Sequence, residues 1–292
     1  MPELPDIVVY QEALELRVAG TRLQRVRIAS PFLLRTVTPP TAAIEGRVIQ
    51  HVERVGKRLV FATEGDLFLV LHLMIAGRLH WKRAGASPPK RVGLAAFDFP
   101  AGTLTLTEAG TRKRASLHLV SSREALGALD PGGIDVLAAA AGQFAEVLRS
   151  RSHTLKRALT DPHLFSGIGN AYSDEILHAA RLSPLQLTRN LSDEEVRRLY
   201  DAAGLVLRLW IERLRDEAGG EFPEKVTAFR EEMSVHGRFG KPCPRCGAPV
   251  QRIVYAENEA NYCARCQTAG RLLADRALSR LLHEDWPRKL EE

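Results

Sequence analysis

The feature that most constrains this chain is the spacing of its cysteines. All four lie within residues 243–266, where "CPRC" and "CARC" form a C-x2-C-x16-C-x2-C pattern. Four unrelated thiols would not need this regularity, whereas two close pairs of thiolates can surround one zinc ion tetrahedrally. Four protein ligands leave no open coordination position, so the zinc is expected to be structural. We therefore predict one Zn2+ in a hairpin, held by Cys243, Cys246, Cys263 and Cys266.

Charge and hydropathy give a weaker indication of the partner and the compartment. The formal net charge is +6, and Arg245, Arg252 and Arg265 place part of it beside the cysteines. This favours an anionic partner such as nucleic acid, although many basic proteins bind none and zinc ribbons also serve protein contacts. No apolar run approaches about 20 residues, and no secretory signal opens the chain. We expect a monomeric cytoplasmic protein with no membrane contact, in keeping with reduced cysteines.

The first half of the chain has the pattern of a β domain. Residues 22–120 contain short, often alternating apolar segments bounded by turn residues and not separated by helices. Such strands indicate an antiparallel sandwich or barrel. The best hairpin candidate is "LAAFDF-PAG-TLTLTE", with Phe97, Phe99, Leu104 and Leu106 at alternating positions.

The pattern becomes helical near residue 127 and stays so to about residue 218. Ser192 and Glu195 predict a capping box, and apolar residues follow it at helical spacing. A chain of 292 residues is expected to hold two or three domains, so we predict an α+β multidomain protein. The predicted parts are a β domain with a leading helix at 1–125, a helical domain at 126–228, the zinc hairpin at 229–270 and a helical tail at 271–292.

A glycine turn lies between two of the predicted helices. In "GIGN" (167–170), glycines would let backbone amides approach a ligand closely, and the start of the next helix favours an anion. Asn170 could then donate a hydrogen bond to a phosphate. An ordinary corner between two core helices would look the same, because glycine turns are common.

The first residues, "MPELPDIVVY", pose a different question. Pro5 and Asp6 suit the first turn of a helix. A helical pattern explains neither Pro2 nor Glu3, so these two residues are candidates for chemistry.

Taken in order, five segments resemble one known family. They are "PELPD", "VGKRLVF", "LHLMIAGRL", "GIGNAYSDEILHAARLSP" and the four-cysteine hairpin. This is the layout of the formamidopyrimidine-DNA glycosylase/endonuclease VIII (Fpg/Nei) family, and the resemblance covers about residues 1–270. It implies an N-terminal antiparallel β-sandwich, a helix–two-turn–helix domain and a C-terminal zinc hairpin that together bind damaged DNA.

The resemblance also implies an activity. Members of this family remove damaged, in particular oxidised, bases and then nick the strand, as bifunctional glycosylases and abasic-site lyases. Pro2 matches the nucleophile, exposed when Met1 is removed, which forms a Schiff base with the sugar. Glu3 matches the acid/base residue. Lys57 matches a lysine that contacts the phosphate beside the lesion and assists elimination; without the resemblance it would be read as a solvated turn lysine.

Further positions match DNA contacts of the family. Asn170 and Lys156 match the asparagine and lysine of a phosphate clamp in the helix–two-turn–helix element. His72 in "LHL" also matches a DNA contact, although a histidine between two leucines could equally be a packed core residue.

The chain departs from the family in three places. Ile75 occupies the position of a methionine that fills the gap left by the flipped-out base. In "TEAGTRKRAS", Arg112 and Arg114 are present but no aromatic residue follows either of them. Asn258 occupies the position of a phosphate-binding arginine in the hairpin, and glutamates flank it.

These departures concern lesion choice and phosphate binding and leave Pro2, Glu3 and Lys57 in place. We therefore expect an active lyase. The alternative is a protein of the same fold that binds damaged DNA or abasic sites without efficient base excision. A zinc-ribbon transcription or translation factor would not explain the first 60 residues.

Overall fold

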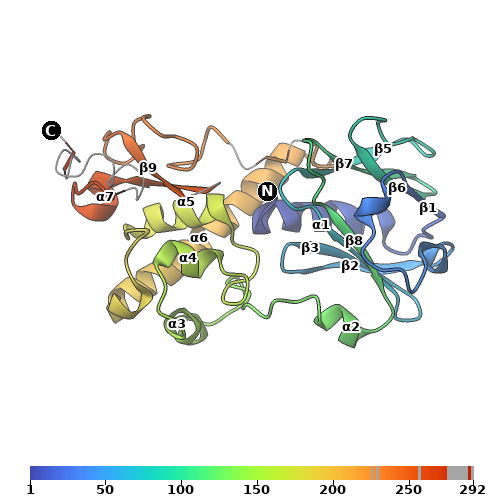
Figure 1. The fold of residues 1–292 in the computed structure, drawn as a ribbon, viewed down its shortest axis with the longest axis horizontal. Coiled ribbons are helices and arrows are strands. Elements are labelled where there is room, and N and C mark those ends of the chain that lie inside the picture. The colour runs from blue at the N-terminus through green and yellow to red at the C-terminus, as the bar shows by residue number, and fades with distance from the viewer. Residues whose placement is uncertain (225, 228–229, 256–257, 275–288, 291–292) are drawn as a thin grey trace. The chain divides into compact units, whose positions relative to one another are not determined.

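Strands dominate residues 25–120 in a computed structural model that describes residues 1–224, 226–227, 230–255, 258–274 and 289–290. They form two four-stranded antiparallel sheets (Figure 1). One sheet has the order β1 (Arg25–Ile28), β6 (Gly93–Phe99), β7 (Gly102–Glu108) and β5 (Gly77–Lys82). The other has the order β2 (Ile49–Val55), β3 (Arg58–Thr63), β4 (Phe68–His72) and β8 (Ser116–Val120).

The hydrophobic core lies between the two sheets. Buried side chains from both, such as Phe61 of β3 and Phe97 of β6, belong to one apolar cluster. Because the two sheets are separate and face each other, the architecture is a sandwich and not a barrel. The predicted hairpin is confirmed: β6 and β7 pair from Phe99 and Gly102 outward, and its alternating apolar side chains are buried.

Helix α1 (Leu4–Val18) precedes the sandwich and packs into its core through its apolar face, including Ile7, Tyr10 and Leu14. Glu3 is the residue that caps the helix. Glu3 and Asp6 form a reciprocal capping box, in which the Glu3 backbone N–H donates to Asp6 Oδ2 at 2.9 Å. The cap satisfies amides that have no partner within the helix, and so fixes the chain direction just before α1.

The chain divides into two compact units, one of Met1–Pro131 with Trp210–Thr227 and one of Gly132–Leu209 with Ala228–Glu292. Besides α1 and the sheets, the first unit contains the 3-10 turns η1 (Pro31–Leu33) and η2 (Thr41–Ile44) and the helix α2 (Arg123–Gly127). The second contains α3 (Ala141–Arg149), α4 (Leu155–Thr160), α5 (Asn170–Ala180) and η3 (Thr188–Asn190). Helix α6 (Asp193–Ala218) begins in the second unit and ends in the first.

The start of α6 confirms the predicted capping box. The Glu195 backbone N–H donates to Ser192 Oγ at 3.2 Å, and the Ser192 N–H donates to Glu195 Oε2 at 2.9 Å. Among the described residues, no helix has both the length and the apolar character needed to cross a membrane.

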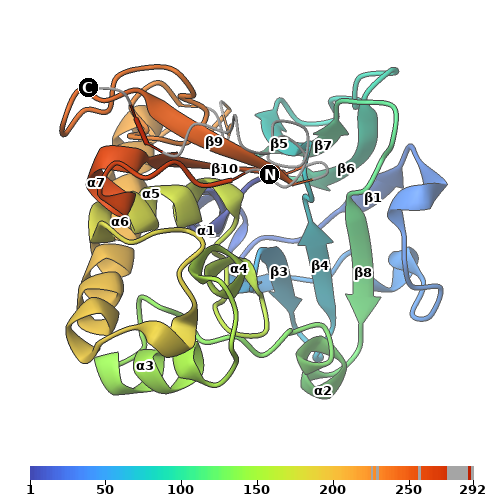
Figure 2. The ribbon, with the colours of Figure 1, turned by 60° about the vertical axis from the view of Figure 1, so that its left-hand side comes forward.

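The cysteine hairpin consists of the antiparallel strands β9 (Val250–Tyr255) and β10 (Asn258–Cys263), followed by the short helix α7 (Ala264–Thr268). Strand β10 lies against α5 (Figure 2). After α7, the Leu273 backbone N–H donates to the Tyr262 hydroxyl at 2.8 Å, which holds Leu273 against β10. The helix expected in the tail falls on residues 275–288, outside the described residues.

Candidate active site and zinc site

Pro2 and Glu3 lie at the start of α1, where the fold holds both of them buried. Glu3 is only 2% exposed, although it is a charged residue two positions from the chain start. The capping box with Asp6 accounts for its fixed position. The first helix therefore supplies the frame that holds the N-terminal residues in place.

Four charged groups act on the amino terminus of the chain. Burial lowers the pKa of the Met1 α-amine, Glu3 and Asp6 raise it, and Arg78 and Lys57 lower it. Two carboxylates and two cations from α1, β5 and the turn between β2 and β3 thus converge on the N-terminus. The predicted residues Pro2, Glu3 and Lys57 are brought together here.

Lys57 is in the tight turn between β2 and β3, and its side chain is half-buried, so it is not the solvated turn lysine of the alternative interpretation. Burial lowers its pKa, while the nearby Glu3 and Asp6 carboxylates raise it. The turn therefore places Lys57 near enough to the two acidic residues at the start of α1 for their charges to act on it.

His72 ends β4, and its partners in register are Arg58 of β3 and Ser116 of β8. Its side chain is half-buried, so it is neither a fully packed core residue nor fully exposed for contact with DNA. Burial, together with the cations Arg58 and Lys57, lowers the pKa of His72 to about 4. His72 is therefore a neutral imidazole beside two positive charges at neutral pH.

Ile75 lies in a tight turn between β4 and β5. Its side chain is 51% exposed. Met74 has a left-handed backbone with φ of 53°. The turn closes with the Gly77 N–H donating to the Leu73 carbonyl at 2.9 Å, and a Cβ on Gly77 would lie 2.3 Å from that oxygen. Only glycine fits this position. The tight turn therefore fixes the backbone around Ile75, whose side chain is partly exposed to solvent.

The arginines of the neighbouring loop are arranged by a carboxylate that the sequence did not single out. Glu108, at the end of β7, is 1% exposed and accepts hydrogen bonds from the backbone N–H groups of Arg114 at 2.9 Å and Ala115 at 3.1 Å. The Lys113 ammonium donates to the Glu108 carbonyl. Arg112 is exposed and Arg114 half-buried in the loop that results.

The predicted phosphate clamp is in the second unit. Asn170 is the first residue of α5, directly after the glycine turn, and is half-buried. The Lys156 ammonium donates to the Asn170 carbonyl at 2.6 Å and to Asp174 Oδ1 at 2.6 Å. Its side chain is 11% exposed, and these bonds use two of its three hydrogens. Lys156 thus fixes the start of α5 from within the protein.

Helix α5 also holds the segment that leads to the zinc hairpin. Glu175 accepts hydrogen bonds from the backbone N–H groups of Ser234, Val235 and His236 at 2.7, 2.9 and 3.0 Å. Asp174 Oδ2 lies 2.8 Å from His236 Nδ1. These buried polar residues of α5 were missed from the sequence, because polar residues in an amphipathic helix are expected to face water.

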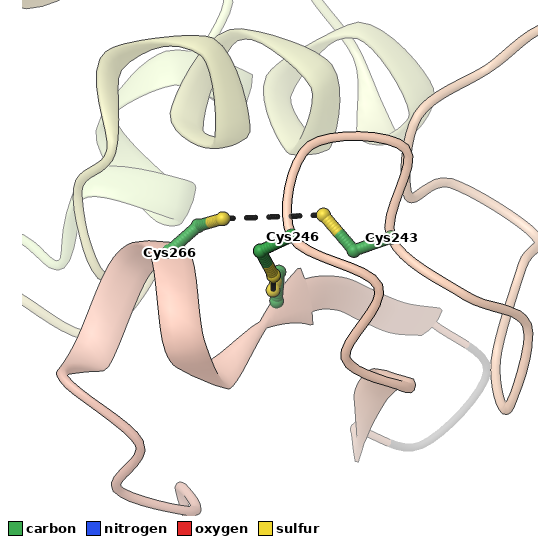
Figure 3. A group of neighbouring side chains, drawn as sticks. Cys243, Cys246 and Cys266 are labelled. Carbon is green, nitrogen blue, oxygen red and sulfur yellow. Dashed lines mark hydrogen bonds between the residues drawn. The ribbon is translucent and has the colours of Figure 1, made fainter.

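The four cysteines converge as predicted. Their sulfur atoms all lie within 4.8 Å of one another, with Cys243 and Cys266 3.9 Å apart and Cys246 and Cys263 3.4 Å apart (Figure 3). Tetrahedral zinc with Zn–S bonds of about 2.3 Å requires sulfur separations of about 3.8 Å. The donor set therefore fits one structural Zn2+ with no open position for a substrate.

Asn258 is the first residue of β10 and pairs with Tyr255, but its side chain lies outside the described part of the structure. On β9, the Arg252 guanidinium lies 4.4 Å from the ring centroid of Phe239 and 3.8 Å from Glu259. The role of Asn258 stays a prediction.

Comparisons with known proteins agree with this arrangement in all three parts of the chain that they match. The model of the formamidopyrimidine-DNA glycosylase N-terminal domain matches residues 1–117, and that of the formamidopyrimidine-DNA glycosylase H2TH (helix–two-turn–helix) domain matches residues 133–218. The model of a zinc finger found in FPG and IleRS matches residues 240–269.

Curated relatives and solved structures are similar over the same length. Formamidopyrimidine-DNA glycosylases of Thermus thermophilus and Heliobacterium modesticaldum are 35% and 34% identical, covering 92% and 91% of this chain and 100% of each relative. Lactococcus lactis Fpg in complex with a Fapy-dG-containing DNA gives a TM-score of 0.80 at 26% identity, covering 91% of this chain and 100% of that one. The same enzyme with an abasic-site DNA gives 0.79, at 26% identity and 91% and 99% coverage. The chain belongs to the formamidopyrimidine-DNA glycosylase family.

Proposed function

We propose that this protein is a DNA repair glycosylase with abasic-site lyase activity, and that the nitrogen of Pro2, exposed by removal of Met1, is its nucleophile. The observation that carries the proposal is the convergence of Glu3, Asp6, Lys57 and Arg78 on the amino terminus. Family membership supplies the reaction class, and this cluster supplies groups suited to each of its steps.

The first requirement is an unprotonated amine. An α-amino group has an ordinary pKa near 8. Burial and the cations Arg78 and Lys57 disfavour a further positive charge at the N-terminus, while Glu3 and Asp6 oppose them. The same surroundings would act on the Pro2 amine once Met1 is gone, and they keep part of it neutral and nucleophilic at cellular pH.

The covalent steps then use the neighbouring carboxylate. The bond from the Pro2 nitrogen to the sugar C1′ forms as the bond from C1′ to the damaged base breaks, and the base leaves with the bonding electrons. The attacking nitrogen then passes its proton to the departing base, which frees its lone pair for the next step. Glu3 gives a proton to the ring oxygen O4′ as the C1′–O4′ bond opens, which leaves an iminium ion. The iminium acidifies the hydrogen on C2′, so the Glu3 carboxylate left by the previous step can take that proton. The electrons of the C2′–H bond then form a double bond to C3′ as the C3′–O bond breaks, which expels the 3′ phosphate and nicks the strand.

Lys57 of this cluster and several side chains outside it would hold the DNA backbone. Lys57 is a cation for the phosphate beside the lesion, and the neutral His72 next to it can donate one hydrogen bond. Asn170, with the N-terminus of α5, provides amide and backbone donors for a second phosphate. Lys156 positions Asn170 through the bond to its carbonyl.

The second candidate function is abasic-site binding with lyase activity but inefficient base excision. The loop after β7 favours it, because Arg112 and Arg114 are present there without an aromatic side chain to fill the space of an extruded base. In both cases the protein acts on DNA, and we place it in the cytoplasm, at the nucleoid, where its substrate and reduced cysteines are found together.

One paired assay separates the two functions. Borohydride reduces the iminium and traps protein on DNA, so trapping is measured on a duplex with a preformed abasic site and on matched duplexes with an oxidised purine or pyrimidine. A glycosylase-lyase is trapped on both kinds of substrate, and a protein with lyase activity alone is trapped only on the abasic duplex. Absence of trapping on both kinds of substrate would refute both candidate functions.

A further inference from the structure

Helix α5 faces the zinc site with a buried histidine that no step of the proposed reaction uses. His178 lies in the last turn of α5 and is 4% exposed. Its Nε2 atom is 3.3 Å from the sulfur of Cys243, which is 65 residues further along the chain. The distance is that of an N–H···S hydrogen bond, which is longer than one to oxygen because sulfur is larger.

The identity of the donor follows from the chemistry of the partner. A zinc-bound cysteine is a thiolate without a hydrogen, so its sulfur can only accept. The His178 nitrogen that faces it must therefore carry a hydrogen. Such a bond draws negative charge from the sulfur and fixes its direction, as outer hydrogen bonds to metal ligands do generally.

We propose that His178 is a positioning residue that donates its Nε2–H to the Cys243 thiolate and so fastens the zinc site to α5. The contact adds to those of Asp174 and Glu175, which hold residues 234–236 on the same helix. His178 follows Asn170 by eight residues in one helix of 11, so the zinc site is built on the helix that begins with the proposed phosphate ligand.

The test compares two substitutions in the full-length zinc protein. His178→Phe keeps a planar ring but has no donor. His178→Gln has an amide nitrogen that can reach about as far as Nε2 and can donate. His153→Phe is the matched control, since His153 is half-buried in the same unit and its hydrogen bonds to Thr188 are made by its backbone N–H and carbonyl groups, not by its ring. Zinc transfer to a coloured chelator is followed with time, and circular dichroism monitors the fold.

His178→Phe is expected to release zinc about tenfold faster than the original protein, with release by His178→Gln close to the original rate and His153→Phe unchanged. In cobalt-substituted protein, loss of the hydrogen bond raises the energy of the sulfur electrons, so the thiolate-to-cobalt absorption moves to longer wavelength in His178→Phe and returns in His178→Gln.

Equal zinc release by His178→Phe and the original protein overturns the proposal. So does equally fast release by the Phe and Gln variants, because the ring shape and not the hydrogen bond would then matter. If His178→Phe retains no zinc at all, retention by His178→Gln supports the proposal and its loss there refutes it. No DNA enters these measurements, so their outcome is independent of the proposed function.

Discussion

Gly77 and Glu108 are direct partners across β5 and β7, at the ends where one strand begins and the other stops. The turn before Gly77 and the loop after Glu108 therefore emerge side by side from one edge of the sheet. The turn presents Ile75, and the loop presents Arg112 and Arg114. The pairing of two strands thus brings together residues that are 37 and more positions apart in the sequence.

The Glu108 carboxylate is expected to stabilise this loop substantially. Glu108→Gln removes the charge and turns an NH2 group toward the Arg114 and Ala115 amides, which are donors themselves. Hydrogen bonds to a charged group contribute about 1.5–3 kcal/mol each in net terms, so we expect the free energy of unfolding in urea to fall by about 1–3 kcal/mol. Glu64→Gln, an exposed carboxylate, is the control. Equal stability of both variants would show that Glu108 does not hold the loop.

The lowered pKa of His72 leads us to expect that the stability of the fold depends on pH. Its pKa is about 4 in the folded protein and 6.5 when unperturbed, so the unfolded chain binds more protons between these values. Stability from this group is present above about pH 6.5 and is lost as the pH falls toward 4.

Urea unfolding at several pH values checks this difference. His72→Gln, which does not titrate, should lose less stability than the original protein between pH 6.5 and pH 4. His153→Gln serves as the control and should follow the original profile. A His72→Gln profile parallel to that of the original protein would contradict the assignment.

DNA binding should depend on salt in a way that separates Lys57 from Asn170. A lysine that neutralises one phosphate releases a counterion, which contributes about 0.9 to the slope of log affinity against log salt. Lys57→Gln should therefore weaken binding to an abasic-analogue duplex and reduce that slope by about one. Asn170→Ala should weaken binding with an unchanged slope, since asparagine carries no charge. If the slope is the same for the Lys57 variant and the original protein, Lys57 does not contact a phosphate.

The sequence predicted those parts of the fold that depend on residues close together in the chain. The cysteine spacing, the hairpin of β6 and β7 and the capping box of Ser192 and Glu195 each depend on neighbours in the chain. The contacts of α5 could not be predicted in this way. Asp174 meets His236 and His178 meets Cys243 across 62 and 65 residues, and helical periodicity does not say which segment lies opposite a face.

The candidate site shows the same division. The resemblance to the family singled out Pro2, Glu3 and Lys57, and Asp6 joins them through the local capping box at the start of α1. Arg78 joins them only because α1 and β5 meet in the folded unit. Likewise, Glu108 looks like an ordinary strand-end residue in the sequence. Its role depends on the chain turning back so that two amides six and seven residues later point at its carboxylate.

The sharpest prediction concerns the chain terminus. We expect mass spectrometry to find a mature protein that begins at Pro2, since a small second residue permits removal of Met1. An uncleavable N-terminal tag should abolish borohydride trapping on abasic-site DNA, because the Pro2 nitrogen then remains an amide without nucleophilic character. The same tag at the C-terminus should leave trapping intact, and Pro2→Gly, which keeps a terminal primary amine, should retain weak trapping. If the N-terminally tagged protein is trapped at the original rate, the nucleophile must be an internal lysine, and Lys57, the lysine beside the N-terminus, would be the first to test.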